Sequence, residues 1–103
     1  MFYLRSMNHI QIIKDYFKNL PVNKVHLFGS YAENTQTEES DIDLLVDVDY
    51  SKSKVSLLDF IGWKLDLEKI IGKKIDLISE DGVSKYIQPF IDKGKVLLFE
   101  KSK

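Results

Sequence analysis

The residues best placed to do chemistry lie where one expected strand ends and the next begins. Gly29 and Ser30 follow the apolar run that ends at Phe28, ten residues intervene, and Asp41 and Asp43 then open a second run. Glycine lets a phosphate approach the backbone closely. Ser30 adds a hydroxyl, and a short helix expected over 31–34 would present the free N–H groups of its N-terminus. Gly29 and Ser30 are therefore a candidate phosphate cradle.

The two aspartates have the spacing of a cation site. Residues two apart on a strand face the same side, so Asp41 and Asp43 should bring their carboxylates together. Neighbouring anions repel each other unless a cation lies between them, and carboxylate oxygens without His or Cys nearby favour Mg²⁺. A phosphate cradle beside a Mg²⁺ site is the arrangement that nucleotide chemistry requires.

A third carboxylate, Asp76, lies in another apolar run at 74–79. If that run pairs beside 42–48, Asp76 joins the face that carries Asp41 and Asp43. It could then bind a second metal ion and take the proton from an attacking hydroxyl. Asp41, Asp43 and Asp76 are therefore the candidate catalytic and metal-binding residues.

The spacing of apolar residues predicts the elements that position these groups. Helical spacing predicts helices at 6–20, 55–71 and 84–93. Ser56 and Asp59 resemble a capping pair for the second helix, and Gly72 ends it. β-type runs predict strands at 24–28, 42–48, 74–79 and 96–100. Alternating helices and strands predict an α/β (α+β) fold in which helices pack on a small mixed sheet.

Composition limits the domain count and the kinds of partner. The chain has 103 residues, so we expect a single domain over 1–103, with a core at about 22–100 after the first helix. Its 15 basic and 16 acidic side chains give no general attraction to nucleic acid or to an anionic membrane. The absence of cysteine excludes a disulfide scaffold and a cysteine nucleophile. No apolar run or signal sequence points to a membrane, so the expected compartment is the cytoplasm.

The sequence resembles the minimal nucleotidyltransferase domains of the DNA polymerase β superfamily. The resemblance rests on Gly29-Ser30, ten residues and Asp41-x-Asp43, and it extends over about 22–100. It implies a polymerase β palm-like fold in which Gly29 and Ser30 hold the triphosphate of a nucleotide. It also implies that Asp41 and Asp43 bind two Mg²⁺ ions, with Asp76 as the third carboxylate.

The sequence departs from the family pattern at one place. Glu33 and Asn34 follow Ala32, where the family commonly has arginine and glycine. Asparagine tolerates a left-handed backbone better than most residues, so Asn34 can replace the glycine. Glu33 removes a positive charge near the expected phosphates.

The same resemblance implies an activity and a partner. Many such stand-alone domains resemble the antitoxin of a two-gene module, whose partner is an all-helical ribonuclease toxin of the HEPN class. The implied reaction is Mg²⁺-dependent transfer of AMP from ATP to a tyrosine of that toxin. Whether the chain forms a homo- or hetero-oligomer stays open. Two alternatives stay open. One is an antitoxin that covers its toxin without catalysis, and the other is the nucleotide-binding part of a small-molecule nucleotidyltransferase.

Overall fold

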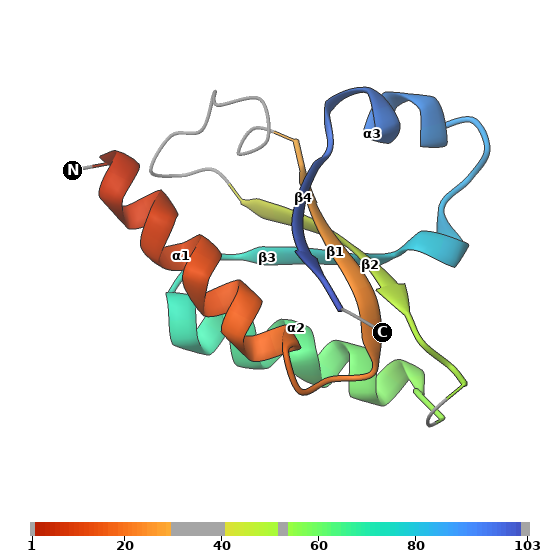
Figure 1. The fold of residues 1–103 in the computed structure, drawn as a ribbon, viewed down its shortest axis with the longest axis horizontal. Coiled ribbons are helices and arrows are strands. Elements are labelled where there is room, and N and C mark those ends of the chain that lie inside the picture. The colour runs from red at the N-terminus through yellow and green to blue at the C-terminus, as the bar shows by residue number, and fades with distance from the viewer. Residues whose placement is uncertain (1, 30–40, 52–53, 102–103) are drawn as a thin grey trace.

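The computed structural model describes residues 2–29, 41–51 and 54–101. Their order along the chain is α1 (Phe2–Phe17), β1 (Val22–Phe28), β2 (Ile42–Val48), α2 (Leu57–Ile71), β3 (Ile75–Ser79), the 3₁₀ turn η1 (Glu80–Gly82), α3 (Gln88–Gly94) and β4 (Val96–Glu100) (Figure 1). The predicted mixture of helices packed on a small sheet is confirmed. None of the described helices is long and apolar enough to cross a membrane.

The described strands form one mixed sheet in the order β3-β2-β1-β4. β1 runs antiparallel to both β2 and β4, whereas β2 and β3 run parallel. The condition set for Asp76, that its run pairs beside 42–48, is therefore met. In this register Asp43 lies opposite Phe28 on one side and opposite Asp76 on the other.

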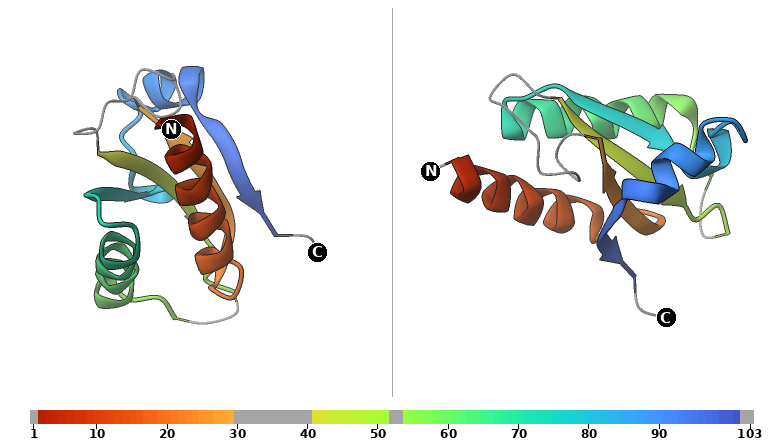
Figure 2. Two further views of the ribbon diagram at one scale, coloured as in Figure 1. Left: turned by 90° about the vertical axis from the view of Figure 1, so that its left-hand side faces the viewer. Right: turned by 90° about the horizontal axis from the view of Figure 1, so that it is seen from above.

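The two long helices cover one face of the sheet and enclose the core, while α3 lies on the other face (Figures 1 and 2). The core gathers buried apolar side chains from α1, α2 and all four described strands: Ile13, Phe17, Val22, Val25, Leu27, Ile42, Leu44, Val46, Val48, Trp63, Leu67, Ile75 and Leu98. Along β2 the even-numbered residues join this core, so the odd-numbered ones face away from it. This alternation sends Asp43 and Asp47 to the face opposite α1 and α2.

Local sequence signals account for the bounds of α2. The Ser56 side chain accepts from the Asp59 N–H at 3.2 Å, and the Asp59 carboxylate accepts from the Ser56 N–H at 2.9 Å. This is the predicted capping box, and it satisfies backbone donors that the first turn leaves free. Gly72 ends the helix in the left-handed conformation, with φ of 79°.

The other two helices differ in extent from the predictions. α1 occupies Phe2–Phe17 instead of 6–20. It ends before Leu20 because Pro21 disfavours helical geometry at that residue, and the chain turns there. α3 begins only at Gln88, since Pro89 fits the first turn of a helix, where its missing N–H needs no partner. The preceding residues from Ser84 form a turn instead.

Candidate active site

Two carboxylates predicted to act together are direct neighbours across the parallel strands. Asp43 on β2 and Asp76 on β3 occupy opposed positions in the ladder, so their side chains emerge on the same face. Asp41 lies one residue before β2, where the Ile42 N–H donates to the Lys74 carbonyl at 3.0 Å and joins the strand starts. The structure therefore brings Asp41, Asp43 and Asp76 to one end of the sheet.

The pKa of Asp43 is raised by its surroundings in the cluster. Burial, a side-chain hydrogen bond with Asp76 and the negative charges of Asp76 and Asp41 raise the pKa of Asp43 to about 6. Each cause penalises a second negative charge at this place. A strongly perturbed carboxyl with specific charge partners is a common mark of a functional site.

Gly29 packs against this carboxylate at the end of β1. Its φ is 74°, and a Cβ built there would lie 2.2 Å from Asp43 Oδ2. Any side chain would therefore be strained and would also displace the aspartate. The sequence suggested glycine for close approach of a phosphate. The contact with Asp43 is a second reason, and only the three-dimensional register reveals it.

Several predicted site features lie outside the described residues. These are Ser30, the short helix expected over 31–34, and the departure at Glu33 and Asn34. The described part of the site consists of Gly29 and the three aspartates.

The donor set at this end of the sheet is suited to a hard divalent cation. Among the described residues, no three His, Cys, Asp or Glu side chains are arranged as a metal-binding group. However, Asp43 and Asp76 lie opposite each other on adjacent strands, and a cation between them would relieve the repulsion that adds to burial in raising the pKa of Asp43. Oxygen ligands without nitrogen or sulfur donors fit Mg²⁺.

Other acidic residues on the same face do not join this cluster. Asp47 lies at the far end of β2, where Asn23 Nδ2 donates to its carboxylate at 3.5 Å. Asp49, beyond the strand, accepts from the Ser51 N–H at 3.0 Å. Both carboxylates therefore serve local polar contacts at the opposite end of the strand.

Comparison with known proteins finds a matching family model and relatives of this chain. Residues 6–100 match the family model of the nucleotidyltransferase domain. A relative from Methanocaldococcus jannaschii, provisionally named a protein adenylyltransferase, is 40% identical over 89 residues, which are 85% of each chain. The match to the family model covers nearly the whole chain, including every described strand.

Two solved structures share the fold at lower identity. A chain from a crystal structure of a toxin–antitoxin with AMP-PNP superposes with a TM-score of 0.74 and 21% identity, covering 92% of this chain and 75% of that one. A chain from a complex of a tri-AMPylated Shewanella oneidensis HEPN toxin with an MNT antitoxin has a TM-score of 0.64 and 18% identity, covering 98% and 74%. At these identities the likeness concerns the fold.

Proposed function

Because this chain belongs to the nucleotidyltransferase domain family, we propose that it transfers AMP from ATP to a hydroxyl group. The observation that carries the proposal is the pairing of Asp43 with Asp76 beside the Gly29 backbone. Carboxylates at this place can bind the metal that accompanies a triphosphate, and a glycine backbone can face the phosphates. We assign metal binding to Asp41, Asp43 and Asp76, and phosphate binding to Gly29 and Ser30.

The roles of the side chains follow from their places along the sheet edge. Asp76 lies on β3, one strand further from Gly29 than Asp43. An acceptor hydroxyl on the Asp76 side would give its proton to that carboxylate while its oxygen bonds to the α-phosphorus. The bond from the α-phosphorus to the bridging oxygen breaks on the opposite side, and pyrophosphate leaves towards Gly29 and Ser30. The products are an AMP ester and pyrophosphate.

Mg²⁺ fits the donor set, and we propose that two ions bind the three aspartates. When bound, the metal neutralises charge on the phosphates and on the departing pyrophosphate. The chain itself supplies the carboxylates in a fixed register, because Asp43 and Asp76 are set by adjacent parallel strands.

For the acceptor we propose a tyrosine of a HEPN-type toxin, which this chain would silence as its antitoxin. Support comes from the solved complex of a tri-AMPylated HEPN toxin with an MNT antitoxin and from the name of the Methanocaldococcus relative. In this proposal the two proteins form a hetero-oligomer. The expected compartment is the cytoplasm, which supplies ATP and Mg²⁺.

Incubation with ATP labelled at the α-phosphate, Mg²⁺ and a purified HEPN-type toxin tests the proposal. We expect label on the toxin, and loss of labelling in Asp43→Asn. Asp47→Asn is the matched control, since Asp47 lies on the same face of β2 but outside the cluster.

The same experiment separates the alternative functions. Inhibition of the toxin without label would identify an antitoxin that acts by contact alone. Label on an added small-molecule alcohol, with none on the toxin, would identify a small-molecule nucleotidyltransferase.

A further inference from the structure

A small pocket opens on the side of Gly29 that faces away from Asp76. Its volume is about 200 Å³, and its described lining consists of Phe28 and Gly29 at the end of β1 and Phe90, Ile91 and Gly94 on α3. Pockets that enclose a whole small-molecule ligand usually have volumes of roughly 300–1,000 Å³. This one is therefore large enough for part of a ligand, and its two phenylalanines favour a flat apolar part.

The order of strands fixes the position of the pocket relative to the carboxylates. Along the sheet the order is β3, β2, β1 and β4, so Asp76 comes first, then Asp43, then Gly29. The pocket adjoins Gly29 and is roofed by α3, the helix that leads into β4. A ligand whose phosphates lie against Gly29 and Asp43 would thus have the pocket within its reach.

Phe90, on α3, is one of the residues that line this pocket. Its side chain is 80% exposed, although the next residue, Ile91, is buried and anchors the helix. Because the helix is anchored, a ligand that stacks on this exposed ring would order little of the protein beyond the ring itself. Such a ring is suited to stack against a planar partner.

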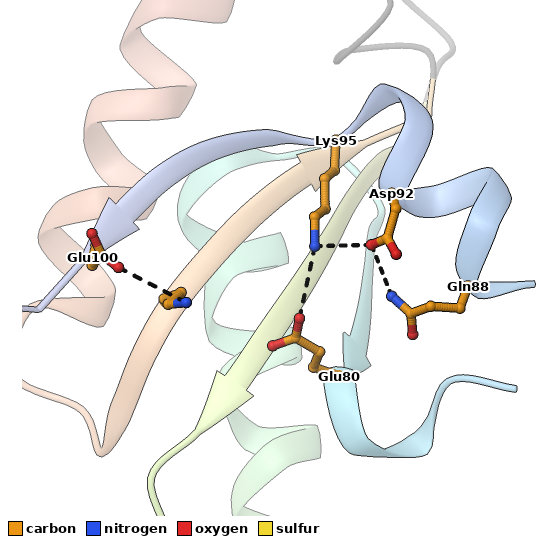
Figure 3. Close-up of polar contacts among 6 residues, drawn as sticks. Glu80, Gln88, Asp92, Lys95 and Glu100 are labelled. Carbon is orange, nitrogen blue, oxygen red and sulfur yellow. Dashed lines mark hydrogen bonds and ion pairs between the residues drawn. The ribbon is translucent and has the colours of Figure 1, made fainter. Parts of the chain in front are cut away.

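A polar network holds α3 in place beneath that ring. Lys95 Nζ lies 2.9 Å from Asp92 Oδ1 and 3.8 Å from Glu80 Oε1, and Gln88 Nε2 donates to the same Asp92 oxygen at 2.9 Å (Figure 3). The Lys95–Glu80 pair joins the end of α3 to the 3₁₀ turn that follows β3, and Asp92 connects Gln88 to the same lysine. The helix that carries Phe90 is therefore linked to that turn.

We propose that this pocket receives the base of the nucleoside triphosphate, with Phe90 as its stacking residue. The proposal rests on the proposed function, because it concerns the nucleotide that the site would bind. Phe90 determines affinity for the nucleoside part of the substrate and takes no part in the bond changes. The Lys95 network acts on Phe90 only by positioning α3.

The place of the pocket favours the nucleotide over the acceptor. In a displacement at phosphorus the attacking oxygen and the leaving oxygen lie on opposite sides. The acceptor approaches from Asp76 in the proposed reaction, whereas the pocket adjoins Gly29, on the side of the bound triphosphate. An acceptor ring in this pocket would place its hydroxyl on the wrong side for Asp76.

Binding measurements with two ligands test this assignment. Calorimetry with ATP and with inorganic tripolyphosphate, each with Mg²⁺, compares a ligand that has a base with one that lacks it. We expect Phe90→Ala to weaken ATP binding by about 5- to 150-fold, the usual range for a base–aromatic stack, and to leave tripolyphosphate binding unchanged. Phe90→Trp should retain ATP binding. Tyr86→Ala is the matched control, because Tyr86 is 88% exposed just before α3 and does not line the pocket.

The outcomes separate this inference from the function on which it rests. A wild-type protein that binds neither ligand would overturn both. Wild-type binding of both ligands with an unchanged ATP affinity in Phe90→Ala would overturn the base assignment alone. Unchanged ATP affinity with slower transfer to the toxin would also overturn it, because the pocket would then serve the acceptor.

Discussion

Asp43 and Asp76 face each other across adjacent parallel strands, and burial together with the neighbouring Asp76 carboxyl raises the pKa of Asp43 to about 6. The backbone register of β2 and β3 places the two residues opposite each other, whatever the conformations of their side chains. Burial makes the largest contribution to the raised pKa, followed by the hydrogen bond with Asp76. A fold that keeps two carboxyls in this arrangement is destabilised by it unless a cation or a proton is bound.

The first prediction concerns the stability of Asp43→Asn in metal-free buffer. Folding raises the pKa of Asp43 from 3.8 to about 6, so the folded state binds the proton more tightly than the unfolded state does. The stabilisation is present below the lower value and is lost as pH rises through the higher one. The variant should therefore melt higher than the wild type at about pH 8 and should lose that advantage at about pH 4. Equal melting temperatures across this range would contradict the raised pKa.

The second prediction compares alanine at two glycines. Gly29 and Gly72 both have positive φ, 74° and 79°, so either substitution should cost about 1–3 kcal/mol of backbone strain. A Cβ at Gly29 would collide with Asp43 Oδ2, whereas nothing lies within 4 Å of one at Gly72. Both variants should lower the melting temperature, but only Gly29→Ala should lose transferase activity. Full activity in Gly29→Ala would show that the contact with Asp43 has no functional role.

The extent to which sequence predicts this site depends on whether a feature is local. The capping box of Ser56 and Asp59 and the alternation along β2 are local, and both were predicted. The partnership of Asp43 with Asp76 needed one assumption, that two particular strands pair. The closeness of Gly29 to Asp43 could not be predicted, because it depends on the register between β1 and β2.

The features around α3 were also beyond prediction. Pro89 obscured where the helix begins, since proline both breaks helices and starts them. The ion pair of Lys95 with Glu80 joins segments on either side of α3. Phe90 becomes a candidate only because it lines the same pocket as Gly29. Lysines and exposed aromatics are common on surfaces, so neither residue type carries a signal by itself.

The third prediction separates proton transfer from nucleotide binding at Asp76. Asp76→Asn should leave most of the affinity for ATP and Mg²⁺ in place, through Gly29, Ser30, Asp41 and Asp43. The chemical step should fall by ~10²-fold or more, as for loss of a positioned base. Single-turnover rates and binding isotherms, measured together, check this. A variant with nearly normal values in both assays would remove Asp76 from the mechanism.

The fourth prediction concerns the coupling of ATP and Mg²⁺. Metal and triphosphate would share oxygen ligands at the aspartates, so each should strengthen the binding of the other. Thermal melts should show a larger shift with both ligands than the sum of the two separate shifts. The Asp43→Asn variant should lose this excess while Asp47→Asn retains it. Additive or absent shifts in the wild-type protein would indicate a site that does not assemble a metal–nucleotide complex.

In the proposed function, the aspartates around Asp43 support the transfer of AMP to a tyrosine of a partner toxin. The most direct measurement is the mass of a HEPN-type toxin after incubation with this protein, ATP and Mg²⁺, followed by fragmentation to locate the modified residue. We expect the mass increase of an added AMP group on a tyrosine with the wild-type protein and with Asp47→Asn, and none with Asp43→Asn. An unmodified toxin, or equal modification by Asp43→Asn, would contradict it.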